Sequence, residues 1–294
     1  MLGYLAAIAI IVGIYTLLTL GLNLQFGFTG LINFGHVGFF AIGAYGSALL
    51  TLHGAPFVAG FAAAMVLAAL AAFPLGLLAI RLRDDYLAIV TLGFAEIVRL
   101  VIQSEQELTG GVQGLSGIPR PFGQLGVGQA EWAYLGLVLA LDVLAIGAIV
   151  LLTRSPFGRL IRAVRDDEVA VRSLGKDPVG VKIRVFMVGA SLAGLAGALY
   201  AHYITYLSPD QFIPLITFYV WMAMIIGGTG RIGGTVLGAG ILVLILEGTR
   251  FVQDIVPGRL GTEMASIRLG LIGLCLILFV LYRPQGIIAD KAQR

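Results

Sequence analysis

Long runs of apolar residues dominate the sequence and decide what it can fold into. Such runs cover residues 4–22, 57–80, 132–153 and 181–201 with very few charged side chains. About 20 apolar residues form a helix that crosses the roughly 30 Å hydrocarbon core of a membrane. In the whole chain 59% of the residues are hydrophobic and 12% are charged, whereas soluble domains have about 45–50% and about 25%. The sequence therefore predicts an all-α, polytopic membrane protein.

Hydropathy predicts about nine transmembrane helices, within a range of eight to ten, in a single domain that covers residues 1–294. The predicted helices cover residues 4–22, 36–52, 57–80, 86–103, 132–153, 181–204, 213–227, 234–250 and 269–282. The first run lacks the basic start and the cleavage site of a secretory signal, so it is expected to remain as the first helix. The loop 104–131 is long, glycine-rich and poor in Lys and Arg, which is typical of an external loop.

The basic residues predict the orientation, because short cytoplasmic loops of membrane proteins are enriched in Lys and Arg. The chain has 19 Lys and Arg residues, and eight of them lie between residues 154 and 184. This stretch is therefore predicted to be cytoplasmic, together with the basic C-terminal tail. The same pattern explains the net charge of +3 better than a nucleic-acid partner does.

Within this stretch, residues 155–178 have the pattern of two short helices joined at a corner. Ser155-Pro156 is a strong helix start, since serine caps free amides and proline fits the first turn. Apolar residues recur at helical spacing up to the acidic run Asp166-Asp167-Glu168, which suits the positive end of a second helix, and Gly175 is a stop signal. The segment is either a rigid charged element or an ordinary solvated loop.

Amides and glycines interrupt the apolar pattern between residues 23 and 36. Non-helical backbone at membrane depth is tolerated only where protein or a cavity surrounds it, and transporters use such breaks to bind substrate. Thr29, Asn33 and His36 are therefore candidates for lining a substrate path. The alternative is a polar loop between helices at the cytoplasmic face.

Thr91, Glu96 and Asp142, on two predicted helices, complete the candidate substrate path. Charged residues inside a membrane are costly and mark either pairings or functional paths. Glu96 and Arg99 lie three residues apart on one helix face and can neutralise each other. Asp142 stands alone in its helix, where it either meets a neighbouring subunit or lines a polar path.

Glycine and alanine have two further roles in the pattern. Gly189, Ala193, Gly197 and Ala201 recur every fourth residue, which predicts close packing between helices in lipid. The run 227–234 is rich in glycine, yet it lacks the Lys-Ser/Thr ending of a nucleotide-binding loop. We expect this run to form a tight turn between two helices.

The side chains give no sign of enzymatic or metal chemistry. The three histidines do not cluster with carboxylates or cysteine at metal-ligand spacing, and no motif marks a nucleophile. The single cysteine, Cys275, excludes an internal disulfide. We therefore expect no catalytic residue, no cofactor and no metal.

Seven groups of residues spread over the chain share the pattern of one transporter family. They are residues 21–36 with 42–45, 85–99, 108–119, 162–175, 190–199, 227–234 and 283–287. On these stretches the sequence resembles the permease subunits of branched-chain amino acid ABC transporters, in particular the M-type subunit of leucine/isoleucine/valine systems.

The resemblance implies an importer permease in a bacterial inner membrane that works with other subunits. These partners would be a homologous H-type permease, two cytoplasmic ATPases that hydrolyse the ATP, and an extracytoplasmic solute-binding protein. It also implies that residues 162–175 form the coupling helix, which docks on an ATPase. The candidate coupling residues are Arg162, Arg165, Asp166, Asp167, Glu168, Ala170, Arg172 and Gly175.

Three alternatives to a branched-chain amino acid importer remain at this level. Related permeases carry urea or short-chain amides, so the substrate could belong to that class. An ion-coupled secondary transporter would place acidic residues at the membrane midplane, where only Asp142 and Glu96 qualify. A passive channel would have no use for the coupling segment.

Overall fold

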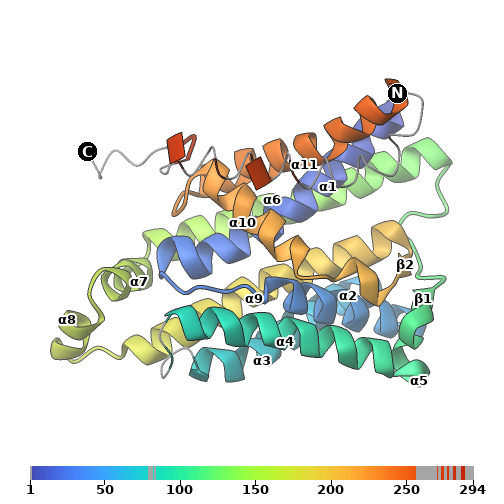
Figure 1. Cartoon of the computed structure of the whole chain (residues 1–294). Helices are drawn as coiled ribbons and strands as arrows, with labels where there is room; N and C mark the ends of the chain where they lie inside the picture. The colour runs from blue at the N-terminus through green and yellow to red at the C-terminus, as the bar shows by residue number, and fades with distance from the viewer. Residues whose placement is uncertain are drawn as a thin grey trace.

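The protein is built almost entirely from helices, most of which run along a common direction (Figure 1). The structure, a computed structural model, describes residues 2–78, 82, 84–255, 270, 273, 274, 277, 281, 282 and 286–288. The helices are α1 (Leu2–Leu22), α2 (His36–Leu52), α3 (Phe57–Leu78), α4 (Asp84–Ser104), α5 (Gln106–Thr109), α6 (Val127–Arg154), α7 (Pro156–Asp166), α8 (Glu168–Ser173), α9 (Pro178–Ile204), α10 (Leu215–Gly227) and α11 (Ile232–Ile255).

Among these described residues, six helical stretches are long and apolar enough to cross a membrane. They are Gly3–Phe28, Phe57–Leu78, Asp85–Ser104, Gly128–Arg154, Pro178–Ile204 and Pro209–Gly227. The apolar parts of α2 and α11 are shorter. The chain is therefore an all-α, multi-pass membrane protein, as predicted.

The first eight predicted helices all coincide with observed ones, and their ends differ by at most five residues. The largest differences are the start of α6 at residue 127 and the end of α11 at residue 255, where helix continues past the apolar stretch that hydropathy detects. The ninth predicted range, 269–282, which contains Cys275, lies for the most part outside the described residues, and so does the basic C-terminal tail. The count of about nine transmembrane helices stays a prediction.

Helix α9 lies at the centre of the packing, because α1, α2 and α3 all pack against it. Its small residues make this possible. A Cβ atom added at Gly197 would lie 2.1 Å from the carbonyl oxygen of Phe40 on α2, and one at Gly194 would lie 2.4 Å from the carbonyl oxygen of Ala64 on α3. This close approach confirms the packing predicted from the four-residue spacing.

A second group of helices surrounds α1, which packs against α6, α10 and α11 as well as α9. Helices α10 and α11 also pack against each other. The glycine-rich run 227–234 forms the tight turn between them, as predicted, since α10 ends at Gly227 and α11 begins at Ile232.

The loop 104–131 is folded rather than extended. It contains α5, the 3₁₀ turn η2 (Gly111–Gln113) and strand β1 (Leu115–Ser116), which pairs antiparallel with β2 (Tyr206–Leu207) after α9. A further 3₁₀ turn, η3 (Pro209–Gln211), follows β2. These elements lie at one end of the bundle, and α7 and α8 lie at the opposite end (Figure 1).

Replacing Gly197 with alanine is expected to weaken the packing of α2 on α9. The added methyl group meets a backbone carbonyl that cannot rotate away, so the cost is expected to be about 1–3 kcal/mol of unfolding free energy. Thermal unfolding of the purified protein in detergent measures this loss. Gly147→Ala in α6 is the matched control, because no described residue lies within 4 Å of the added atom. Equal melting temperatures for both variants would contradict the role given to this contact.

Candidate functional site

The chain breaks its helical course between α1 and α2, inside the protein. Helix α1 widens into the π-helix η1 (Asn23–Phe28), and residues 29–35 are not helical. Gly30 adopts a φ of 80°, which costs glycine little because it has no Cβ. The break confirms the predicted interruption, and its polar side chains are buried. Protein therefore surrounds the irregular backbone, as a membrane environment requires.

Asn33 lies in the buried core and is the centre of the hydrogen bonds that hold this break. Its Nδ2 donates to Oε1 of Gln25 at 2.8 Å, and its Oδ1 accepts from the amide of Gly35 at 2.8 Å. Its main-chain carbonyl accepts from the indole Nε1 of Trp221 at 3.0 Å. Gln25 in turn donates to the carbonyl of Phe186 at 2.9 Å. One asparagine thus joins the break to α10 directly and to α9 through Gln25.

His36 begins α2 and is completely buried. Its Nε2 lies 3.1 Å from the carbonyl oxygen of Leu18, and its Nδ1 lies 3.4 Å from Nδ2 of Asn33. A carbonyl oxygen only accepts, so Nε2 carries the hydrogen, and Nδ1 is then free to accept from the amide of Asn33. The ring is a neutral imidazole that links α1 to the break.

Two threonines fix the backbone at the end of the break. Thr91 on α4 accepts from the amide of Phe34 at 3.0 Å and donates to the carbonyl of Ala88 at 2.9 Å. Thr217 on α10 accepts from the amide of Val37 at 3.0 Å. Each hydroxyl satisfies an amide that the interrupted helix leaves without a main-chain partner.

Four of the six candidate substrate-path residues therefore gather in one place. Thr29, Asn33, His36 and Thr91 are all buried, and Thr29 donates to the carbonyl of Leu24 at 3.2 Å. In the described part of the chain, their hydrogen bonds go to the protein itself. Contact between these side chains and a substrate stays a prediction.

The other two candidates lie outside this network. Glu96 pairs with Arg99 on the same face of α4, and Arg99 reaches both carboxylate oxygens. This confirms that the two charges neutralise each other. Asp142 lies on α6 and is 5% exposed.

Sequence reasoning missed three members of the network. Gln25 had a usable signal, because it is a second amide in the same interrupted stretch. Thr217 and Trp221 had none, because a threonine and a tryptophan in an apolar helix do not reveal which backbone groups they will meet.

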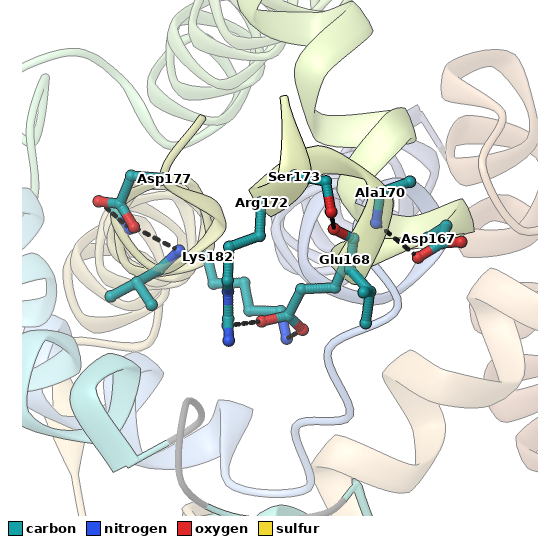
Figure 2. Close-up of polar contacts among 10 residues, drawn as sticks. Asp167, Glu168, Ala170, Arg172, Ser173, Asp177 and Lys182 are labelled. Atoms are coloured by element: carbon teal, nitrogen blue, oxygen red, sulfur yellow. Dashed lines mark hydrogen bonds and ion pairs between the residues drawn. The ribbon is translucent and has the colours of Figure 1, made fainter. Parts of the chain in front are cut away.

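The segment 155–178 forms two short helices with a corner, as the pattern predicted. Ser155 caps α7 by accepting from the amide of Gly158 at 3.3 Å. Asp167 adopts extended geometry at the corner and caps α8 by accepting from the amide of Ala170 at 2.9 Å. Gly175 follows with a φ of 72°. Figure 2 shows the caps and ion pairs of α8.

Glu168 orients α8 relative to α9. Its carboxylate accepts from Nη2 of Arg172 at 2.9 Å and pairs with Nζ of Lys182 on α9 (Figure 2). This pairing turns Glu168 and Arg172 toward each other, and two apolar side chains stay exposed beside the charged residues of the segment. Val169 is 74% exposed and Leu174 is 80% exposed.

Arg165 connects this segment to the break in α1. Its Nη1 donates to the carbonyl of Gly27 in η1. The turn between α10 and α11 meets the same π-helix, because Oδ1 of Asn23 accepts from the amide of Gly230 at 2.8 Å. The Nδ2 of Asn23 donates to the carbonyl of Arg231 at 3.2 Å. Two segments that lie far from η1 in the sequence thus converge on it.

The matching family and the relatives with the highest coverage agree with one another. Residues 4–280 match the family described as "Branched-chain amino acid transport system / permease component". The chain is 36% identical over 308 residues to the high-affinity branched-chain amino acid transport system permease protein LivM of Salmonella typhimurium, covering 96% of this chain and 69% of the relative. It is 37% identical over 305 residues to LivM of Escherichia coli K12, with the same coverage.

A more distant relative extends the similarity beyond these two bacteria. The chain is 27% identical over 235 residues to the probable branched-chain amino acid transport permease protein LivM of Methanocaldococcus jannaschii, covering 78% of this chain and 68% of the relative. No solved structure matches the chain with significant similarity.

Replacing Asn33 with alanine is expected to destabilise the protein by about 2–4 kcal/mol, because it leaves the Oε1 of Gln25 and the amide of Gly35 without partners in a buried site. Thermal unfolding in detergent provides the measurement. Ser104→Ala is the control, since the Ser104 hydroxyl is exposed and donates to the carbonyl of Val101 in its own helix. A melting temperature unchanged in Asn33→Ala would show that the break does not depend on this hub.

Proposed function

Because the chain belongs to the family of branched-chain amino acid transport permeases, we propose that it is a membrane permease subunit of an ATP-driven importer for branched-chain amino acids. The observation that carries the proposal is the similarity to permeases named LivM along 96% of the chain. The multi-pass helical architecture is consistent with it. Urea and short-chain amides are the less favoured substrates, because these relatives are named for branched-chain amino acids.

The proposal includes the partners that an importer of this kind needs. A second, homologous permease would complete the membrane unit, and two ATPase subunits would bind at the end that carries α7 and α8. A solute-binding protein would deliver the substrate at the opposite end. The sequence contains no nucleotide-binding loop, so the ATP would be hydrolysed on the separate subunits.

The docking surface for an ATPase is proposed to be the outer face of α7 and α8. A groove in this segment is lined mainly by apolar residues, among them Phe157, Leu160 and Leu174, and also by Arg159 and Lys176. Exposed apolar residues on a short, capped helix form a firm contact, because burial of apolar area drives association. The ion pairs of Glu168 hold this surface in one orientation relative to α9.

Movement of this docked element is proposed to reach the membrane region through Arg165. The guanidinium is bonded to the carbonyl of Gly27, so a shift of α7 pulls directly on η1. From η1 the displacement meets the network around Asn33, which ties α9, α10 and α4 to the break. We therefore place the substrate path beside this network, with Thr29, Asn33, His36 and Thr91 as the side chains that such a movement would rearrange.

Uptake of radiolabelled leucine tests the proposed function. The chain is reconstituted in proteoliposomes with its candidate permease partner, the ATPases and the binding protein, and ATP is supplied on one side at a time. Uptake should require ATP on the side of α7 and α8 and should be reduced by competing valine and isoleucine. If urea or an amide is carried instead under the same ATP dependence, the permease assignment stands and the substrate is wrong.

Two substitutions in the coupling segment should separate docking from transmission. Val169→Asp places a charge on the exposed surface of α8 and should weaken ATPase binding about tenfold or more. Arg165→Gln should leave ATPase binding intact but lower leucine uptake about 10-fold to 100-fold, because it removes a charge-assisted hydrogen bond. Co-purification measures binding, and uptake with parallel ATP hydrolysis measures transmission.

Each variant has a matched control elsewhere on the surface. Val112→Asp puts the same charge on an exposed valine in η2, at the other end of the bundle. Arg154→Gln neutralises an exposed arginine at the end of α6. Normal uptake by Arg165→Gln would show that the bond to Gly27 carries no movement.

A further inference from the structure

Helices α1, α6 and α11 together form a groove of about 500 Å³. Its α1 wall extends from Leu5 to Thr16, which is about 16 Å at the helical rise of 1.5 Å per residue. Among the described residues that line it, Thr16 and Asp142 are the only polar ones. The groove is thus an elongated apolar surface with one carboxylate in it.

The carboxylate of Asp142 lacks a hydrogen-bond donor in the part of the chain that the structure describes. The residue is only 5% exposed, and its buried Oδ1 has no hydrogen-bond partner there. The hydroxyl of Thr16 cannot supply the hydrogen, because it donates to the carbonyl of Val12 at 2.8 Å. Asp142 therefore lines the groove with a carboxylate of which one oxygen, the buried Oδ1, is unsatisfied.

The position of Asp142 makes the missing hydrogen bond costly in free energy. It lies near the middle of α6 (Val127–Arg154), away from both ends of the helix. A polar group without a partner is costly in an apolar medium, and ionisable residues at membrane depth pair with other groups. Asp142 therefore needs a hydrogen-bond donor that the described part of the chain does not provide.

The walls of the groove would allow another helix to pack closely against them. No described residue lies within 4 Å of a Cβ atom added at Gly240 on α11, so within the described part of the chain this glycine leaves an open notch. Val143 on α6 and Leu244 on α11 are 69% and 62% exposed at its sides. Small residues flanked by larger apolar ones are the surfaces on which transmembrane helices approach each other.

We propose that this groove binds a transmembrane helix of the second permease subunit, and that this helix donates a hydrogen bond to Asp142. The inference rests on the proposed function, which supplies the second subunit. A helix fits the length and the apolar walls of the groove. The unpaired carboxylate specifies the chemistry of its contact side chain, which is a cation or a hydroxyl or amide donor.

Two other occupants fit the groove less well. A metal cation needs several oxygen ligands, whereas the described lining offers one carboxylate and a hydroxyl that is already engaged. A branched-chain amino acid could place its ammonium group on Asp142, but its own carboxylate would find no donor there. A helix of the partner can donate to Asp142, and it brings no free carboxylate that would need a donor of its own.

Photo-crosslinking in the assembled transporter tests the position of the partner. The complete complex is prepared with p-benzoylphenylalanine at Val143 of this chain, and the control carries the probe at Ile97, an exposed residue on α4. The probe at Val143 should form an adduct with the second permease subunit, and the probe at Ile97 should not. Adducts with lipid alone, with another subunit, or equally from both positions would overturn the inference.

Substitution of Asp142 tests the chemistry of the contact. Asp142→Leu should weaken retention of the second permease subunit about 3-fold to 30-fold, the range for one hydrogen bond in a membrane. Asp142→Asn keeps an acceptor oxygen and should retain more of the subunit than Asp142→Leu. Equal retention by the wild type and both variants would overturn the inference.

A stability measurement separates this contact from simple misfolding. The isolated chain carrying Asp142→Leu should melt no lower than the wild type, because the substitution removes a buried acceptor without a partner. A lower melting temperature would show that Asp142 is satisfied within its own chain and would overturn the inference.

The proposed function and this inference fail in different experiments. Absence of ATP-dependent leucine uptake by the wild-type complex would contradict the proposed function, whether or not the adduct forms. Normal uptake without an adduct at Val143 would contradict only the groove contact.

Discussion

The need to satisfy backbone hydrogen bonds inside a membrane governs the architecture around the break after α1. A helix that stops at membrane depth leaves amides and carbonyls that lipid cannot bond. Here the break is enclosed, so side chains take the place of water: Thr91 and Thr217 accept from main-chain amides, and Asn33 and Gln25 bridge to neighbouring helices. The enclosure requires α9 to approach closely, which its small residues permit. Packing and polar satisfaction therefore depend on the same arrangement.

These side-chain hydrogen bonds also connect the break to several other segments of the chain. A regular helix bonds mainly to itself, whereas an interrupted one must bond to whatever surrounds it. The π-helix η1 consequently contacts α7 through Arg165 and the α10–α11 turn through Asn23. A displacement at the α7–α8 end of the protein thus has a bonded route into the middle of the bundle. The route exists because the helix is broken.

Much of the fold could be predicted from local sequence patterns, but the pairings between residues far apart in the sequence could not. The first eight helices, the capped corner of α7 and α8 and the Glu96–Arg99 pair follow from spacing within a few residues. The partners of Asn33 and Arg165 do not, because Trp221 and Gly27 are more than 130 positions away from them. No periodicity encodes which backbone carbonyl a guanidinium meets. Sequence reasoning therefore found the break and the two short helices α7 and α8, but not the contact between them.

Glu96 and Asp142 show why an acidic residue in an apolar helix has no single meaning. Both were candidates for a substrate path on the same ground, namely charge at membrane depth. Glu96 has Arg99 one turn away, so its charge is neutralised by its own helix. Asp142 has no such neighbour, and its Oδ1 has no partner in the described residues of the folded chain either. A hydrogen bond that is missing in the folded chain is best supplied by a second subunit on assembly. Such a subunit gains the free energy of this hydrogen bond in addition to that of the apolar contact.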